Sequence, residues 1–255
     1  MPSFASYPSL KGRSVLVSGG GSGIGAGIVE HFAAQGAKVG FVDVDEPGSH
    51  SVIKSIAQSG HAAPTFRRCD IRDTAAYKAT IAEIAKAIGP IAVLVNNAAR
   101  DDRHKIDEVT EAFWDERIAV NLRHHYFAAQ AVVPGMRKAG GGSIINLSSM
   151  SYVAMTDNLT VYQAAKAAVI GMTRGLARDL GGDGIRVNSV MPGWIMTERQ
   201  IKLWLTPQAE ADLMRQQCLK EKLYPADIAR MILWLAADDS RLVTAQNFIV
   251  DGGRN

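Results

Sequence analysis

The stretch Ser14-Val-Leu-Val-Ser-Gly-Gly-Gly-Ser-Gly-Ile-Gly-Ala-Gly-Ile-Val-Glu-His-Phe-Ala-Ala-Gln-Gly36 joins an apolar run, a glycine-rich turn and a segment of helical periodicity. The run Ser14–Ser18 predicts a buried strand. Apolar residues recur at helical spacing over 28–33, and Gly36 follows where a helix would stop. The stretch therefore predicts a strand, a glycine turn and a helix in that order.

Six more short apolar runs follow at intervals filled by helical patterns, as expected when crossover helices join parallel strands. With the first run, the predicted strands are Ser14–Ser18, Lys38–Val42, Thr65–Arg68, Ile91–Val95, Ser143–Leu147, Arg186–Val190 and Phe248–Val250. We expect one α/β domain over 1–255, with a parallel sheet of about seven strands covered on both faces. The region 192–224 shows no clear pattern, and we interpret it as a substrate lid.

Residues 18–25 bring backbone amides and a helix N-terminus together, the arrangement that binds a pyrophosphate. A glycine-rich loop alone is often only a turn. Asp43 strengthens the dinucleotide interpretation because it ends the second strand about 20 residues later, where a carboxylate binds the adenosine ribose and repels a 2′-phosphate. Asp45 is a rival for this role. Since neither Ser22 nor Val44 supplies a positive charge, we predict NAD rather than NADP as the cofactor.

Composition and charge argue against several classes of protein. The formal net charge is +3 with 21% charged residues, and no basic run marks a nucleic-acid surface. The two cysteines, Cys69 and Cys218, stand apart from any metal-ligand spacing, so we expect neither a disulfide nor a bound metal. Residues 1–11 lack a signal pattern and no apolar run reaches about 20 residues. We therefore expect a cytoplasmic protein that binds neither membranes nor nucleic acid.

Tyr162 and Lys166 lie four residues apart, so on a helix they share one face. A nearby ammonium favours the phenolate form of tyrosine, which can then act as a general base. Such a pair alone is more often two surface neighbours. Thr160 and Gln163 resemble a capping box that would start this helix just before them. Ser149 lies upstream on a separate segment and could hold the same substrate oxygen.

The ordered set of motifs resembles the short-chain dehydrogenase/reductase family over nearly the whole chain. The matching segments are the glycine loop, Asn96-Asn-Ala-Ala99, Asn121, Ser149, Tyr162 to Lys166, and Pro192-Gly-Trp-Ile-Met-Thr197. Ser18 in place of a usual threonine and Ala99 in place of a usual glycine depart from the pattern without removing a catalytic group. The resemblance implies a doubly wound Rossmann fold.

The resemblance also implies roles for individual residues. Tyr162 would be the base in oxidation, Ser149 would orient the substrate oxygen, and Lys166 would bind the nicotinamide ribose and lower the tyrosine pKa. Asn121 would complete a proton relay, although a lone asparagine inside a helix more often satisfies local backbone. The implied cofactor contacts are Gly19, Ser22, Gly23, Ile24, Gly25, Asp43, Asp70, Ile71, Asn96, Ala98, Tyr162, Lys166, Pro192, Gly193, Ile195 and Thr197.

Segments outside these shared motifs are similar to bacterial aldose 1-dehydrogenases, especially those for D-xylose. They include Tyr7-Pro-Ser-Leu-Lys-Gly12, Asp101-Asp-Arg-His-Lys105 and Gln217-Cys-Leu-Lys220. The implied reaction is oxidation of an anomeric carbon by NAD to give an aldonolactone. Candidate sugar contacts are Ser149, Ser151, Tyr152, Asn158, Tyr162 and Trp194. Asp101 to His104 are left out, because consecutive charges after a strand are more often solvated.

Two other functions stay open from the sequence. One is dehydrogenase or reductase activity on another sugar, a steroid or a 3-oxoacyl thioester, because one scaffold hosts many chemistries. The other is a non-enzymatic NAD-binding protein. The resemblance further implies a homotetramer with an interface formed by the Tyr162 helix and 114–131. The small residues Ala164, Ala165, Ala167, Ala168, Gly171 and Gly175 fit this interface, or simply close packing within one subunit.

Overall fold

The computed structural model describes residues 4–254, so Met1–Ser3 and Asn255, the two ends of the predicted domain, lie outside the described residues. All predicted strands form, and they make one parallel sheet of seven strands within this range, in the order β3-β2-β1-β4-β5-β6-β7. The bounds are β1 (Ser14–Ser18), β2 (Lys38–Asp43), β3 (Thr65–Arg68), β4 (Val93–Asn96), β5 (Gly142–Leu147), β6 (Ile185–Pro192) and β7 (Asn247–Val250). The predicted single-domain, doubly wound Rossmann fold is confirmed.

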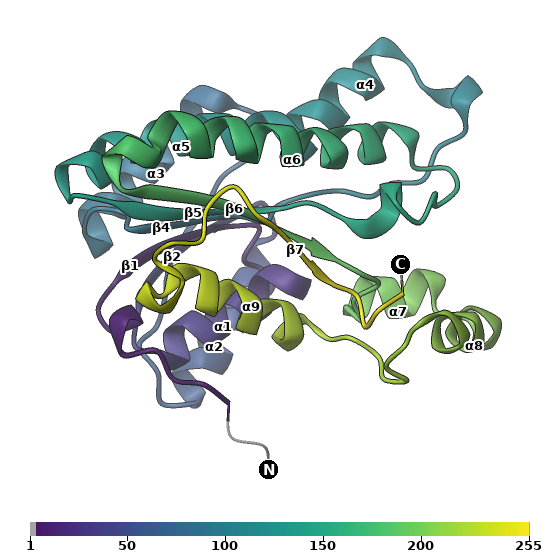
Figure 1. The fold of residues 1–255 in the computed structure, drawn as a ribbon, viewed down its shortest axis with the longest axis horizontal. Coiled ribbons are helices and arrows are strands. Elements are labelled where there is room, and N and C mark those ends of the chain that lie inside the picture. Colours follow the sequence, from purple (N-terminus) through teal and green to yellow (C-terminus); the bar gives the residue numbers. More distant parts are fainter. Residues whose placement is uncertain (1–3, 255) are drawn as a thin grey trace.

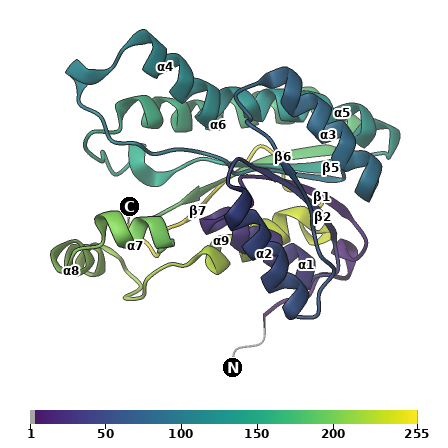
Figure 2. The same ribbon diagram turned by 180° about the vertical axis from the view of Figure 1, so that it is seen from behind.

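Helices cover both faces of the sheet (Figures 1 and 2). One layer contains α1 (Gly23–Ala34), α2 (Glu46–Gln58) and α9 (Pro225–Ala236). The other contains α3 (Thr74–Ile88), α4 (Glu111–Ile118), α5 (His124–Lys138) and α6 (Thr160–Leu180). The strand order changes direction between β1 and β4, and in open α/β sheets the crevice at this switch point is where ligands bind.

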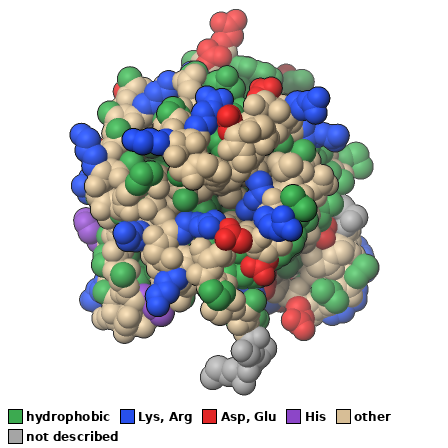
Figure 3. Space-filling model, turned by 60° about the vertical axis from the view of Figure 1, so that its left-hand side comes forward, with side chains coloured by type: hydrophobic (Ala, Val, Ile, Leu, Met, Phe, Trp, Pro, Cys, Tyr) green, Lys and Arg blue, Asp and Glu red, His purple; other side chains and the backbone are tan. Residues whose placement is uncertain are grey.

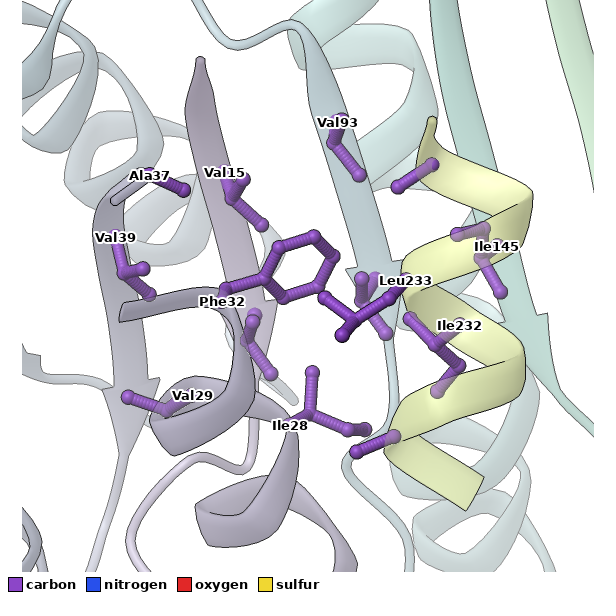
Figure 4. Close-up of a cluster of buried hydrophobic side chains, with 14 of the residues drawn as sticks. Val15, Ile28, Val29, Phe32, Ala37, Val39, Val93, Ile145, Ile232 and Leu233 are labelled. Atoms are coloured by element: carbon purple, nitrogen blue, oxygen red, sulfur yellow. The ribbon is translucent and has the colours of Figure 1, made fainter. Parts of the chain in front are cut away.

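The apolar strand runs supply two hydrophobic cores, one on each face of the sheet. In the core shown in Figure 4, Phe32 of α1 packs against Val15 of β1 and Leu233 of α9. Because both faces of the central strands are covered, β1 and β4 are buried throughout, and each carries three consecutive apolar residues instead of alternating with polar ones. Their carboxyl ends are thereby held rigidly at one edge of the sheet.

The region 192–224 folds into α7 (Glu198–Trp204) and α8 (Pro207–Gln216), which lie beyond the end of the sheet (Figure 1). Its two ends meet, because Ile195 pairs with Leu223 and the Met196 amide donates to the Leu223 carbonyl at 2.8 Å. On the face shown in Figure 3, Lys and Arg side chains are scattered among neutral and hydrophobic ones. Across residues 4–254, no helix is both long and apolar enough to cross a membrane.

Candidate active site

A cavity of about 1170 Å³ opens at the carboxyl ends of the central strands. Its wall contains most of the predicted site residues, contributed by segments far apart in the sequence. Those predicted to bind the cofactor are Gly19, Ser22, Gly23, Ile24, Gly25, Asp43, Asp70, Ile71, Ala98, Pro192, Gly193, Ile195 and Thr197. Those predicted to act on or bind the substrate are Ser149, Ser151, Tyr162, Lys166 and Trp194.

The glycine loop brings main chain to the cavity wall. Gly19 and Gly23 have φ of +72° and +56°, a left-handed conformation that favours glycine. A Cβ at Gly25 would lie 1.7 Å from the Gly19 carbonyl oxygen, so no larger residue fits there. Helix α1 begins at Gly23 on this wall, and its N-cap residue Ser22 makes no side-chain capping hydrogen bond. The backbone N–H groups at a helix N-terminus attract anions. This cradle fits a pyrophosphate.

Asp43 is tied directly to this loop. Its Oδ2 accepts a hydrogen bond from the Gly21 amide at 2.8 Å, and its Oδ1 accepts from the Val44 and Asp45 amides at 2.7 and 3.0 Å. Asp45 instead caps α2, because its side chain accepts from the Gly48 amide at 3.1 Å. Both carboxylates line the cavity, and Asp43 is the one of the two that bonds the glycine loop.

Tyr162 and Lys166 are close, as their spacing on α6 predicts. The Lys166 Nζ lies 5.8 Å from the centre of the Tyr162 ring and donates to the Leu147 carbonyl at 2.8 Å. Burial lowers the pKa of Lys166 to about 7. The prediction of a lowered tyrosine pKa is wrong for this structure, because burial, followed by the charge of Asp101, raises the pKa of Tyr162.

Ser149 and Arg103 act in the opposite direction. A side-chain hydrogen bond with Ser149 and the charge of Arg103 both lower the pKa of Tyr162. The Ser149 hydroxyl also donates to the Ser151 Oγ at 3.0 Å and accepts from the Ser151 amide at 3.1 Å. Ser148 faces elsewhere, and its hydroxyl donates to the Lys166 carbonyl at 2.7 Å. The structure thus brings Ser149, not the Ser148 hydroxyl, to the phenol.

Helix α6 begins at Thr160 as predicted, but the predicted capping box is wrong. The Gln163 side chain donates to the Thr156 and Ser151 carbonyls at 2.6 and 3.0 Å, and so anchors the preceding loop. The helix start is satisfied from another segment: the Val161 amide donates to His104 Nε2 at 3.3 Å. The loop after β4 therefore holds the helix that carries the tyrosine.

Four predicted side chains lie away from the cavity wall. Asn96 is buried and donates to Asn146 at 2.9 Å. Asn121 is buried too, and its amide group bonds both the amide and the carbonyl of Arg100, at 2.9 and 3.1 Å. The Tyr152 hydroxyl faces Met191 Sδ at 3.6 Å.

The fourth, Asn158, is an exposed turn residue with φ of +58°. Among the residues that the sequence did not select but that do line the wall are Asn97, Asp101 and Gln200. The Asn97 amide group donates to the Ser18 and Gly19 carbonyls, each at 3.0 Å, and thereby fixes the glycine loop. Alternation along β4 could have selected Asn97 over Asn96, because neighbouring residues point to opposite faces.

Comparisons with known proteins agree with this architecture. A family model described as enoyl-(acyl carrier protein) reductase matches residues 19–255. D-xylose 1-dehydrogenase of Caulobacter vibrioides is 49% identical, covering 98% of this chain and 99% of the relative. The "Probable galactose dehydrogenase" of Rhizobium meliloti is 48% identical, covering 97% of this chain and 96% of the relative.

Among solved structures, a 7α-hydroxysteroid dehydrogenase complexed with NADH and 7-oxo glycochenodeoxycholic acid superposes with a TM-score of 0.91 at 31% identity. The alignment covers 97% of this chain and 96% of that one. Family match, full-length relatives and fold agree with the ordered motifs. The chain is therefore an oxidoreductase of the short-chain dehydrogenase/reductase family.

Proposed function

We propose that this chain oxidises an aldose at its anomeric carbon, with NAD as hydride acceptor and an aldonolactone as product. The observation that carries the proposal is that Ser149, Tyr162 and Lys166 line the same cavity as the glycine loop. The relatives named for D-xylose and galactose support the substrate class. D-xylose and D-galactose share their configuration at C2 and C3 and differ at C4, so closely related pockets can serve both.

The cradle at residues 19–25 would hold the pyrophosphate, Asp43 the adenosine ribose and Lys166 the nicotinamide ribose. We favour NAD over NADP because a 2′-phosphate near Asp43 would meet a negative charge that already holds the Gly21 amide. When bound, NAD supplies a hydride acceptor and a positive charge within the same cavity. Ile195 and Thr197, which line the same cavity, would contact the carboxamide.

Tyr162 would take the proton of the anomeric hydroxyl while Ser149 holds the same oxygen. An anomeric hydroxyl is more acidic than an ordinary alcohol, so it needs a weaker base. Burial raises the pKa of Tyr162, so the phenolate fraction is small at neutral pH and grows as the pH rises. Oxidation should therefore become faster with rising pH. The Asn121 amide is engaged by the Arg100 main chain, so we propose that Asn121 acts by holding that turn.

Residues 192–224 would serve as the lid over the sugar. The segment contributes Trp194 and Gln200 to the wall, and Trp204 at the end of α7 stacks on Arg103 at 4.9 Å from ring centre to guanidinium. The lid thus closes against the loop that follows β4.

We also propose a homotetramer that uses the outer face of α6. Ala164, Ala167 and Ala168 are exposed, and a Cβ at Gly171 or Gly175 would have open space around it. Ala165 is buried, whereas the other five small residues are exposed, so packing within the subunit does not explain them. Light scattering at working concentration tests this, and a strict monomer would contradict it.

The function is tested by initial rates of NADH formation with a panel of aldoses, and by NMR identification of the product. We expect turnover of D-xylose or D-galactose with NAD, and a lactone as the first product. Turnover of steroid or 3-oxoacyl substrates without turnover of any aldose would contradict the proposal.

A further inference from the structure

Three segments that are distant in the sequence meet on the cavity wall beside Tyr162. Asp101 follows β4, Trp194 follows β6, and Gln200 belongs to α7. The Trp194 Nε1 donates to Gln200 Oε1 at 2.9 Å, and the Gln200 Nε2 donates to Asp101 Oδ2 at 2.8 Å. The three side chains therefore form one hydrogen-bonded network that joins residues 192–224 to the loop after β4.

The donor and acceptor roles within this network are fixed by the two outer side chains, Trp194 and Asp101. An indole N–H can only donate and an ionised carboxylate can only accept, so Gln200 must present its oxygen to Trp194 and its nitrogen to Asp101. The other N–H of the Gln200 amide has no acceptor in the part of the chain that the structure describes. Asp101 can accept further hydrogen bonds, since a carboxylate has about four lone-pair sites and its side-chain partners within residues 4–254 are Gln200 and Arg199, the latter at 3.3 Å from Oδ1.

A carboxylate with free lone pairs beside an amide with a free N–H is complementary to a sugar hydroxyl, which both donates and accepts. Asp101 is partly buried, with 23% of its side chain exposed, so a hydrogen bond there is less exposed to competing water. Asp101 and Tyr162 line the same cavity, and the Tyr162 hydroxyl would bind the reacting oxygen of the sugar. The sugar hydroxyl nearest to that oxygen is the one on C2.

We infer that Asp101, oriented by Gln200, recognises the C2 hydroxyl of the sugar and so determines substrate specificity. The inference rests on the proposed function, because it presupposes an aldose in this cavity. Asp101 accepts the hydrogen bond of the hydroxyl, and the free N–H of Gln200 donates to the same oxygen. Trp194 fixes the amide and has no direct part in this contact.

A purely structural role for Asp101 would be to latch the lid, since Gln200 and Arg199 both reach it from α7. The two roles differ in what they predict for a sugar that lacks the hydroxyl. A latch affects all substrates alike, whereas a recognition residue affects only sugars that carry the group. The ratio of kcat/KM between a sugar and its 2-deoxy analogue therefore separates the two roles.

The experiment measures this ratio for D-xylose against 2-deoxy-D-xylose and for D-galactose against 2-deoxy-D-galactose. The wild type should favour the parent sugar by about tenfold to a hundredfold, as expected for a hydrogen bond to a charged group. Asp101→Asn should reduce the preference severalfold, and Gln200→Leu should reduce it as well. NADH binding, followed by fluorescence, should not change.

Asp102→Asn is the matched control. Asp102 is the neighbouring carboxylate, pairs with Arg117 and with Arg199, and does not line the cavity. Its variant should melt at a lower temperature yet keep the wild-type ratio. An unchanged ratio in Asp101→Asn, with equal losses on both sugars, would overturn the inference while leaving the proposed function intact. A wild type that oxidises no aldose would overturn both.

Discussion

The two ends of the cavity are built in different ways. The cofactor end, residues 19–25 with Asp43, is made largely of main chain, and its shape depends on glycines that no other residue can replace. The substrate end, which joins Asp101, Trp194 and Gln200, is made of side chains from three separate segments. The first depends on main-chain geometry, whereas the second depends on hydrogen bonds between side chains. Substitutions at the two ends should therefore have different consequences.

The largest effect is expected from Gly25→Ala at the cofactor end. The added Cβ would lie 1.7 Å from the Gly19 carbonyl oxygen and would push the loop out of shape. We expect loss of detectable NADH binding by fluorescence and loss of turnover with every sugar. Gly181→Ala is the control, because its helical φ of −60° and open surroundings accept a methyl group. Retained NADH binding in Gly25→Ala would show that the loop is more adaptable than its geometry implies.

A smaller loss is expected at the substrate end from Ser149→Ala. Removing a hydroxyl that bonds the developing charge should lower kcat by about tenfold to a hundredfold, with NADH binding preserved. Ser148→Ala provides the comparison, since that hydroxyl bonds the Lys166 carbonyl. It should cost about 1 kcal/mol of stability and leave turnover near the wild-type value. Equal kinetic losses in both variants would mean that the assignment of Ser149 is mistaken.

Asp43→Asn should change the choice of cofactor without destroying the site. The asparagine oxygen can accept either from the Gly21 amide or from the Val44 and Asp45 amides, but not from both sets, and the negative charge is gone. The ratio of kcat/KM for NAD over NADP should fall by about tenfold, the size of a charge interaction of roughly 1–4 kcal/mol near a protein surface. A wild type that uses NADP as well as NAD would contradict the role of Asp43.

The mildest test varies pH. Burial raises the pKa of Tyr162, so at neutral pH the protonated, inactive form dominates. The phenolate fraction, and hence kcat/KM for sugar oxidation, should rise by at most about tenfold per pH unit above neutrality. Reduction of a lactone by NADH should show the opposite trend. An oxidation rate that falls between pH 7 and pH 9 at saturating NAD would mean that another group is the base.

The same contrast explains what the sequence could predict. All seven strands and the glycine loop are readable because they depend on local patterns: continuous apolar runs, and glycine between a strand and a helix. Asp43 is readable because it ends the strand next to that loop. The pairing of Asp101 with Gln200 could not be predicted from the sequence, because these residues are distant in sequence and meet only where α7 packs beside the loop after β4.

Two predictions are wrong because each relied on local spacing alone. The pattern of Thr160 and Gln163 matches a capping box, but His104 from a distant loop takes the Val161 amide instead. The spacing of Tyr162 and Lys166 predicts a lowered tyrosine pKa, but the burial of both groups outweighs their proximity. Local spacing does not reveal how deeply a side chain will be buried.

The most direct test of the account is Tyr162→Phe, which removes the proposed base and retains the aromatic ring. Initial rates of NADH formation with D-xylose and with D-galactose should fall at least about a hundredfold, the lower range for general acid–base catalysis. NADH binding by fluorescence should stay close to the wild-type value, because the glycine loop and Asp43 are untouched. Near-normal turnover of either sugar in this variant would contradict the central claim that Tyr162 takes the proton from the anomeric hydroxyl.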